Sequence, residues 1–250
     1  MTKRFEGKTA LVTGGASGIG KAVALALGSE GANVFVIDLH PDPGKAVVDQ
    51  ITSAGGHAVA VAGNVGNSDD VKAAVDAAVS HYGALHLAFN NAGIGGPLGP
   101  LADITIEGYH QLMDINLHSV FYGMYYEIPE MIKAGGGAIV NTSSILGLVG
   151  DANAVPYVTA KHGLAGMTKA AALGYANQGI RINSVHPGYI DTPLLEGIPK
   201  EMYDGLVSLH PIGRLGTAEE VSKYVLFLLS DDAAFITGSQ AVIDGGYLTK

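Results

Sequence analysis

The 250-residue sequence contains no cysteine and no tryptophan, and only 15% of its residues are Asp, Glu, Lys or Arg. Without cysteine, the protein has no disulfide scaffold, no thiol nucleophile and no thiolate-bound zinc, a composition that fits a cytosolic protein. The low charge and the 48% apolar content argue against intrinsic disorder. A chain of this length buries enough apolar surface to fold as one compact unit.

Positive charge is also scarce, because 14 Lys and Arg face 23 Asp and Glu and the formal net charge is −9. No basic cluster offers a local exception, so we expect no nucleic-acid partner. No stretch reaches the roughly 18 apolar residues of a membrane span, and the first residues do not resemble a signal peptide. The nine histidines are scattered, and His81 and His86 lie on either side of Gly83, so we expect no catalytic metal.

Short apolar runs alternate along the chain with longer segments of helical periodicity. In segments 19–27 and 71–78, apolar residues recur three and four positions apart, which predicts helices with one apolar face. Runs that are apolar on both faces are typical of parallel strands covered by helices. We predict one α/β domain over residues 1–250, a doubly wound parallel sheet flanked by helices on both faces. Its seven strands are expected at Thr9–Thr13, Asn33–Asp38, Ala58–Ala62, Leu85–Asn90, Ala138–Asn141, Arg181–Val185 and Gln240–Ile243.

The first predicted strand runs into TGGASGIG, which places Gly14, Gly18 and Gly20 between a strand and a helix. Glycine permits a tight turn and lets a diphosphate approach the helix amino terminus, where free N–H groups favour negative charge. The spacing departs from G-x-G-x-x-G, so a purely structural turn is the alternative. Residues 15–21 also read G-x-x-x-x-G-K, but Ala22 stands where a nucleoside triphosphatase requires Ser or Thr for magnesium.

Asp38 ends the second predicted strand, 18 residues after Gly20. This is close to the offset at which an acidic residue hydrogen-bonds the adenosine ribose of a dinucleotide. A carboxylate here repels a 2′-phosphate. Leu39 follows it, and no residue from 34 to 42 is Arg or Lys. The sequence therefore favours NAD over NADP. The alternative is that Asp38 only caps the following helix.

Tyr157 and Lys161 lie one turn apart at the start of a predicted helix that Pro156 can open, so their side chains share a face. An ammonium beside a phenol lowers the phenol pKa from about 10 and makes it a usable acid or base. Such a pair also arises by chance in helices. Ser144, however, follows a predicted strand 13 residues earlier, and strand ends face the ligand crevice in this architecture.

Together these motifs resemble the short-chain dehydrogenase/reductase family over nearly the whole chain. Further matching segments are NNAG at 90–93, MDINL around Asn116, YVTAK at 157–161, HPGYIDT at 186–192 and DGGY at 244–247. The resemblance implies a Rossmann-like fold in which Tyr157 exchanges a proton with the substrate oxygen and Ser144 hydrogen-bonds that oxygen. It further implies that Lys161 holds the nicotinamide ribose and that Asn116 supports a water relay.

The resemblance also implies an NAD site. The backbone at Pro187, Gly188 and Ile190 and the Thr192 hydroxyl are expected to bind the nicotinamide carboxamide. For Asn91 and Gly93, the alternative to cofactor binding is a purely structural role. This chain has Asn64 where the family usually carries an Asp before Val65, a difference that bears only on the affinity for adenine. The expected cofactor residues are Gly14, Ser17, Gly18, Ile19, Gly20, Asp38, Leu39, Asn64, Val65, Asn91, Ala92, Gly93, Tyr157, Lys161, Pro187, Gly188, Ile190 and Thr192.

Within the family, the stretch from GLVGD to TPLL resembles bacterial secondary-alcohol dehydrogenases, which implies an NAD-dependent oxidoreductase that interconverts secondary alcohols and ketones. A homotetramer is expected, with the helix after Tyr157 and the C-terminal segment at its interfaces. One alternative is a 3-oxoacyl-(acyl-carrier-protein) reductase, which is disfavoured by the absence of Lys and Arg from 170 to 178. Another is a dinucleotide-binding sensor without turnover, although such proteins usually lack the acid–base tyrosine.

Residues 189–211 form one long segment of weak pattern, which we expect to cover the ligand as a lid. The segment offers apolar and aromatic side chains and no arginine, so it suits an apolar or aromatic ketone better than a carboxylate or phosphate substrate. The alternative is that half of these side chains only pack the lid onto the sheet. The apolar and aromatic side chains of the segment are Tyr189, Leu194, Leu195, Ile198, Met202, Tyr203 and Leu206.

Overall fold

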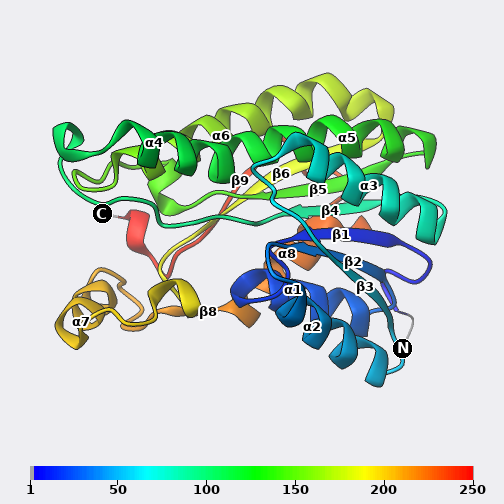
Figure 1. Cartoon of the computed structure of the whole chain (residues 1–250), viewed down its shortest axis with the longest axis horizontal. Helices are drawn as coiled ribbons and strands as arrows, with labels where there is room; N and C mark the ends of the chain where they lie inside the picture. Colours follow the sequence, from blue (N-terminus) through cyan, green and yellow to red (C-terminus); the bar gives the residue numbers. More distant parts are fainter. Residues whose placement is uncertain (1–2, 250) are drawn as a thin grey trace.

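The computed structural model describes residues 3–249 and is built around a seven-stranded sheet (Figure 1). Its strand order is β3-β2-β1-β4-β5-β6-β9, and every neighbouring pair is parallel. This confirms the predicted doubly wound α/β sheet. The strands are β1 (Thr9–Thr13), β2 (Asn33–Asp38), β3 (His57–Ala62), β4 (Leu87–Asn90), β5 (Gly137–Thr142), β6 (Ile180–Pro187) and β9 (Gln240–Ile243).

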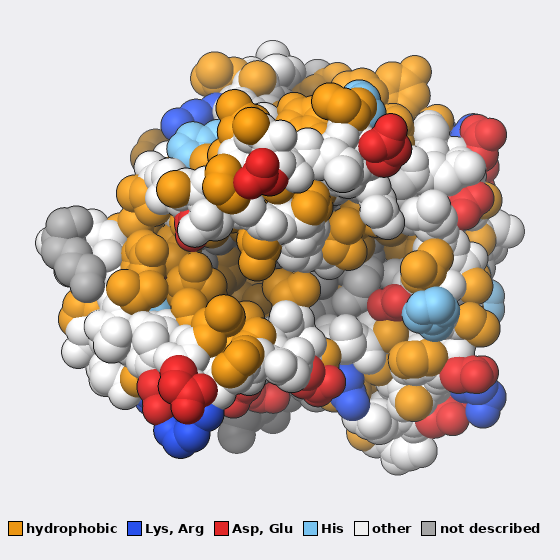
Figure 2. Space-filling model, turned by 60° about the vertical axis from the view of Figure 1, so that its left-hand side comes forward, with side chains coloured by type: hydrophobic (Ala, Val, Ile, Leu, Met, Phe, Trp, Pro, Cys, Tyr) orange, Lys and Arg blue, Asp and Glu red, His pale blue; other side chains and the backbone are white. Residues whose placement is uncertain are grey.

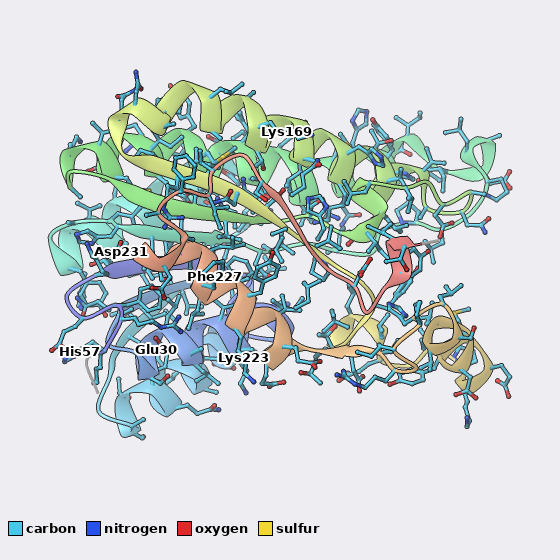
Figure 3. The ribbon with its side chains drawn as sticks, turned by 180° about the vertical axis from the view of Figure 1, so that it is seen from behind. Glu30, His57, Lys169, Lys223, Phe227 and Asp231 are labelled. Carbon is cyan, nitrogen blue, oxygen red and sulfur yellow. The ribbon has the colours of Figure 1, made fainter. Side chains whose placement is uncertain are left out.

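Helices cover both faces of the sheet (Figure 1). On one face, α1 (Gly18–Ser29), α2 (Pro41–Ser53) and α8 (Ala218–Leu229) bury apolar side chains in a common core. Figure 3 shows the molecule from behind, where α8, with the labelled Lys223 and Phe227, runs beside α1. On the other face, α3 (Ser68–Tyr82), α5 (Ser119–Lys133) and α6 (Val155–Tyr175) enclose a second core. Burial on both faces explains why the strands are apolar without alternation.

The strands β1, β2 and β3 are added towards one edge of the sheet, and β4 and the later strands are added towards the other edge. The strands β1 and β4 are therefore neighbours although two strands separate them in sequence. The loops that follow these strands run to opposite sides and leave a crevice at the carboxyl ends. Gly14 (φ +62°) turns the chain after β1, and a Cβ there would lie 2.9 Å from the Ala92 Cα after β4. Glycine is therefore required for the two loops to approach each other.

The segment predicted as a patternless lid contains its own structure. It includes a short strand, β7 (Ile190–Asp191), and a helix, α7 (Lys200–Ser208), and β7 pairs in parallel with β8 (Gly216–Thr217), which lies just beyond the segment. The chain from 190 to 217 therefore leaves and rejoins the domain at one place, next to the start of α8. No helix within residues 3–249 is long and apolar enough to span a membrane.

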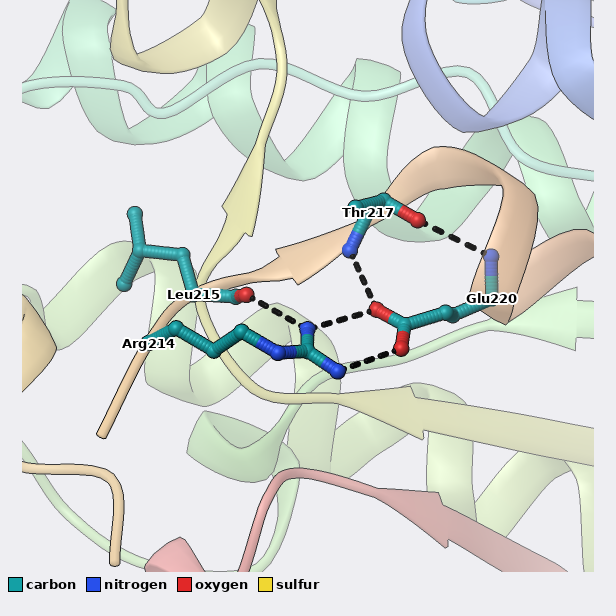
Figure 4. A network of polar contacts seen from close by, with 4 residues as sticks. All are labelled: Arg214, Leu215, Thr217 and Glu220. Atoms are coloured by element: carbon teal, nitrogen blue, oxygen red, sulfur yellow. Dashed lines mark hydrogen bonds and ion pairs between the residues drawn. The ribbon is translucent and has the colours of Figure 1, made fainter. Parts of the chain in front are cut away.

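An ion-pair network holds the chain between residue 214 and the start of α8 (Figure 4). The Arg214 guanidinium donates to both Glu220 carboxylate oxygens at 2.9 and 2.6 Å and to the Leu215 carbonyl at 3.0 Å. The Thr217 hydroxyl accepts the Glu220 N–H at 3.2 Å, and Glu220 accepts the Thr217 N–H at 2.9 Å, which is a capping box at the start of α8. The same carboxylate thus caps α8 and holds Arg214 in the segment before it.

Candidate active site

A cavity of about 800 Å³ opens at the carboxyl edge of the sheet, between the loops after β1, β2, β3, β4, β5 and β6 and the segment 189–206. Figure 2 views the side where α4 (Ile106–Met113) and α7 lie and shows a hollow with mainly hydrophobic walls. All predicted site residues except Gly20 and Asn116 line this cavity. The residues that do so are Gly14, Ser17, Gly18, Ile19, Asp38, Leu39, Asn64, Val65, Asn91, Ala92, Gly93, Ser144, Tyr157, Lys161, Pro187, Gly188, Ile190 and Thr192.

The amino terminus of α1 faces the cavity with uncapped N–H groups. Its N-cap residue, Ser17, makes no side-chain capping hydrogen bond, and the first turn carries no acidic residue. By contrast, the Asn67 side chain caps α3 by accepting two N–H groups. An uncapped helix start at a glycine turn fits a diphosphate. Gly20 serves this turn from outside the cavity, because a Cβ there would lie 2.1 Å from the Gly14 carbonyl oxygen.

Asp38 lies at the end of β2 and holds the glycine-rich turn. Its Oδ2 accepts the Ala16 N–H at 2.9 Å, and it does not cap α2, whose N-cap residue is His40. Among the lining residues, Lys161 is the sole Lys or Arg, and the basic residue that lines the cavity next to Asp38 and Leu39 in sequence is His40. At the adenine side, the Asn64 Oδ1 already accepts the Gly66 N–H at 3.0 Å.

Ser144, Tyr157 and Lys161 meet at the base of the cavity. Ser144 follows β5, and its hydroxyl accepts the Leu146 N–H at 3.1 Å. Tyr157 and Lys161 project from the first turns of α6, which has proline in its opening positions. The Lys161 ammonium is buried, lies 5.4 Å from the centroid of the Tyr157 ring, and donates to the Thr142 carbonyl at 2.7 Å. The fold thus brings together a hydroxyl, a phenol and an ammonium on one wall.

The pKa of Tyr157 corrects one prediction. Burial raises the pKa of the Tyr157 phenol, and a hydrogen bond from Ser144 opposes that rise. Burial also lowers the pKa of Lys161 to about 8. Loss of solvent is the largest cause of the shift in both groups, and the Lys161 ammonium donates its hydrogen bond to the Thr142 carbonyl. In the protein alone, Tyr157 is a protonated acid.

Asn116 and Asn91 brace the cavity walls. Asn116 lies in a π-helical turn (Asp114–His118), is buried, and exchanges two 2.8 Å hydrogen bonds with the backbone of Ile94 in the loop after β4. Such turns are frequent at functional sites. Asn91 lines the cavity and also joins β4 to β1, because its side chain donates to the Thr13 carbonyl at 3.2 Å.

His186 is a site residue whose role the sequence did not reveal. It lies buried in β6, and its Nδ1 is 2.9 Å from the Ser144 carbonyl oxygen. A carbonyl only accepts, so Nδ1 carries the proton and Nε2 accepts the Ser184 hydroxyl at 2.8 Å. Burial lowers the pKa of His186 to about 4, which keeps the ring neutral. The imidazole therefore fixes the backbone at Ser144.

The substrate end of the cavity includes residues outside the predicted set. Ile94 and Leu98 come from the loop after β4, and Leu146, Asp151 and Asn153 from the loop after β5. The rule that strand ends face the crevice would have pointed to both loops. Of the seven predicted lid side chains, all except Tyr203 line the cavity: Tyr189, Leu194, Leu195, Ile198, Met202 and Leu206.

Comparisons with known proteins agree with this geometry. A family model described as Enoyl-(Acyl carrier protein) reductase matches residues 14–248. The cyclohexanol dehydrogenase of Acinetobacter sp. (strain SE19) is 55% identical over 250 residues, which are 100% of this chain and 98% of that enzyme. The cis-4-hydroxycyclohexanecarboxylate dehydrogenase of Sinomonas cyclohexanicum is 41% identical over 247 residues, 99% of each chain. The 3-oxoacyl-(acyl-carrier-protein) reductase of Thermotoga maritima is 38% identical over 243 residues, 97% of this chain and 98% of that one.

Solved structures place the fold in the same group. A short-chain type dehydrogenase/reductase from Mycobacterium marinum superposes with a TM-score of 0.94 at 36% identity, covering 100% of this chain and 98% of that one. The chain belongs to the short-chain dehydrogenase/reductase family. Levodione reductase, another solved structure, has a TM-score of 0.94 at 34% identity, covering 97% and 98%. Membership in the short-chain dehydrogenase/reductase family confirms the expectation of an enzyme and implies a nicotinamide dinucleotide cofactor.

Proposed function

We propose that this enzyme is an NAD(H)-dependent oxidoreductase that interconverts a cyclic secondary alcohol and its ketone. The observation that carries the proposal is the cluster of Ser144, Tyr157 and Lys161 at the base of a cavity with apolar walls. The names of the relatives support the substrate class, because two of them act on hydroxylated six-membered rings. The apolar lid side chains suit such a ring.

The proposed chemistry needs one proton donor and one oxygen-binding group. The dinucleotide, when bound, supplies or accepts the hydride. In ketone reduction, the protonated Tyr157 donates its proton to the carbonyl oxygen as charge develops there, and the Ser144 hydroxyl hydrogen-bonds the same oxygen. In alcohol oxidation the Tyr157 phenolate accepts the hydroxyl proton. The Lys161 ammonium, 5.4 Å from the centroid of the Tyr157 ring, would stabilise that phenolate, and with the dinucleotide bound it would hold a ribose hydroxyl.

The test of this assignment is Tyr157→Phe, which removes the phenolic hydroxyl and keeps the ring. We expect kcat for cyclohexanol oxidation to fall by about 10³ or more, because general acid–base catalysis supplies factors of 10² to 10⁴. Dinucleotide affinity, measured by titration calorimetry, should change less than about threefold. A variant that retains more than a tenth of wild-type turnover would refute the role of Tyr157.

NAD is proposed over NADP because Asp38 ends β2 and no Lys or Arg lines the cavity except Lys161. A 2′-phosphate would meet the Asp38 carboxylate without a compensating cation. The ratio of kcat/KM values with the two cofactors measures this directly, and a wild-type enzyme that prefers NADP would contradict the proposal. Replacing Asp38 with Gly and Leu39 with Arg should shift the ratio towards NADP.

An assay of nicotinamide absorbance with different substrates separates two other functions from the proposed one. A 3-oxoacyl-(acyl-carrier-protein) reductase is favoured by one relative, but an acidic carrier protein would meet a chain of net charge −9. Faster reduction of a 3-oxoacyl thioester than of cyclohexanone would support that activity. A protein that binds the dinucleotide but shows no change in nicotinamide absorbance with any alcohol or ketone would instead be a sensor.

We also propose that residues 189–211 act as a lid and that the enzyme is a homotetramer. Exposed apolar side chains on two helices of the same sheet face support an assembly through α5 and α6, namely Phe121, Tyr125 and Leu173. Phe235, fully exposed before β9, supports a second interface near the C-terminus. Analytical ultracentrifugation tests the assembly, and a monomer at micromolar concentration would contradict it.

A further inference from the structure

The substrate end of the cavity contains a single carboxylate among apolar side chains. Asp151 belongs to the loop between β5 and α6 and is half-buried. The lining also includes the side chains of Leu146, Tyr189 and Met202. The other lining carboxylate, Asp38, lies at the end of β2 and is held by the glycine-rich turn. Asp151 is therefore the fixed acidic group on the substrate side.

Several hydrogen bonds hold Asp151 in place before any ligand enters. Its Oδ1 accepts the Asn153 N–H at 2.9 Å, and its backbone carbonyl accepts the Ala154 N–H at 3.3 Å. The Asn153 carbonyl in turn accepts the Gly99 N–H at 2.8 Å, which clamps this loop to the loop after β4. Within residues 3–249, no hydrogen bond reaches the second oxygen, Oδ2. The carboxylate is thus preorganised with one acceptor oxygen available to a ligand.

Asp151 lines the same cavity as Tyr157 and Tyr189. Burial, followed by the charges of Tyr247, Asp151 and Tyr157, raises the pKa of Tyr189 to about 12. Asp151 therefore shares the cavity with the phenol of the proposed catalytic group. The cavity's sole ammonium, on Lys161, is bound to the Thr142 carbonyl. No cation in the lining is left to neutralise an anionic substituent on the substrate.

We propose that Asp151 is a specificity-determining residue that accepts a hydrogen bond from a second hydroxyl on the alcohol and rejects alcohols bearing a carboxylate. The inference rests on the proposed oxidation of cyclic secondary alcohols and assigns the substituents that the site tolerates. A carboxylate on the substrate would be placed near a fixed negative charge in a largely apolar cavity, where charge repulsion is stronger than in water. A hydroxyl would instead satisfy the available carboxylate oxygen.

Two variants separate this role from a merely structural one. Asp151→Asn keeps an acceptor for the Asn153 N–H and removes the charge, so the loop should keep its shape. Asp151→Leu removes both the charge and the acceptor. Glu196→Gln, on the lid but outside the cavity lining, is the matched control for a change of net charge.

The experiment compares kcat/KM for cyclohexanol, cyclohexane-1,4-diol and 4-hydroxycyclohexanecarboxylate. In Asp151→Asn, we expect the carboxylate-to-cyclohexanol ratio to rise about tenfold, because one charge repulsion is lost. In Asp151→Leu, the diol-to-cyclohexanol ratio should fall about tenfold, because a hydrogen bond to a charged group is lost. Both ratios should stay within about twofold in Glu196→Gln.

The outcomes distinguish the inference from the function on which it rests. If cyclohexanol is oxidised but the carboxylate ratio is the same in wild type and Asp151→Asn, charge exclusion by Asp151 is refuted. An unchanged diol ratio in an active Asp151→Leu variant refutes the hydroxyl contact. If the wild type oxidises no alcohol with either nicotinamide cofactor, the proposed function fails and the role of Asp151 fails with it.

Discussion

The replacement Glu127→Gln should stabilise the protein at alkaline pH and have little effect in acid. Glu127 lies on α5 and is completely buried between the helix and the sheet. Its Oε2 accepts the Asn90 side-chain amide at 3.1 Å, whereas Oε1 has no hydrogen-bond partner in the described part of the chain. Burial therefore raises the pKa of Glu127 from 4.5 to about 7, against the opposing effect of Asn90.

The size of the effect follows from proton linkage. Because the folded pKa is the higher one, the folded state holds the proton more tightly than the unfolded state. The contribution of Glu127 to the stability of the wild type is then greatest below pH 4.5 and falls as pH rises towards about 7. At about 1.4 kcal/mol per pKa unit, the loss is about 1 kcal/mol at about pH 5 and about 3 kcal/mol at about pH 8. Glutamine has the shape of the protonated acid and never ionises, so it avoids this loss.

Urea unfolding followed by far-UV circular dichroism, at fixed protomer concentration, measures the difference. We expect Glu127→Gln to exceed wild type by about 3 kcal/mol at about pH 8 and by about 1 kcal/mol or less at about pH 5. Glu130→Gln is the control, because Glu130 lies on the same helix but pairs with Lys133 at the surface. A stability difference between Glu127→Gln and wild type that does not change with pH would refute the reasoning.

Two further predictions concern the site. Gly20→Ala would place a Cβ 2.1 Å from the Gly14 carbonyl, so it should destabilise the fold by about 2 kcal/mol and weaken dinucleotide binding in calorimetry at least tenfold. The control is Gly174→Ala on α6, because a Cβ at Gly174 would have no atom within 4 Å. It should leave the stability and the dinucleotide affinity unchanged or slightly improved. His186→Leu removes the hydrogen bond to the Ser144 carbonyl, so kcat should fall about tenfold with KM nearly constant, and an unchanged kcat would exclude a positioning role.

The sequence predicted the sheet because parallel strands buried on both faces must be apolar throughout. It also predicted most of the cavity, since Gly14, Asp38 and Ser144 all follow strand ends on one edge of the sheet. The lid helix α7 escaped prediction because most of its residues are exposed and its apolar side chains serve the cavity. The strands β7 and β8 are two residues long, which is too short to show any period.

Contacts made through the backbone were beyond sequence reasoning for a different reason. Asn116 holds the Ile94 backbone, His186 holds the Ser144 carbonyl, and Lys161 donates to a carbonyl as well. Any residue type offers these partner atoms, so no pattern of side chains marks them. Asp151 reaches the cavity because a hydrogen-bonded turn sets its loop, and one Asp in a glycine-rich stretch carries no comparable signal.

The state of Tyr157 shows why an isolated pair of residues is a poor guide to pKa. Spacing alone placed an ammonium one turn from the phenol and predicted a lowered pKa, whereas burial raises it. The cavity lining carries one ammonium, Lys161, against the carboxylates of Asp38 and Asp151, and burial also weakens the charge of that ammonium. The free protein therefore favours the neutral phenol and is prepared to donate a proton to a ketone. Alcohol oxidation instead requires the phenolate, which the burial of Tyr157 disfavours.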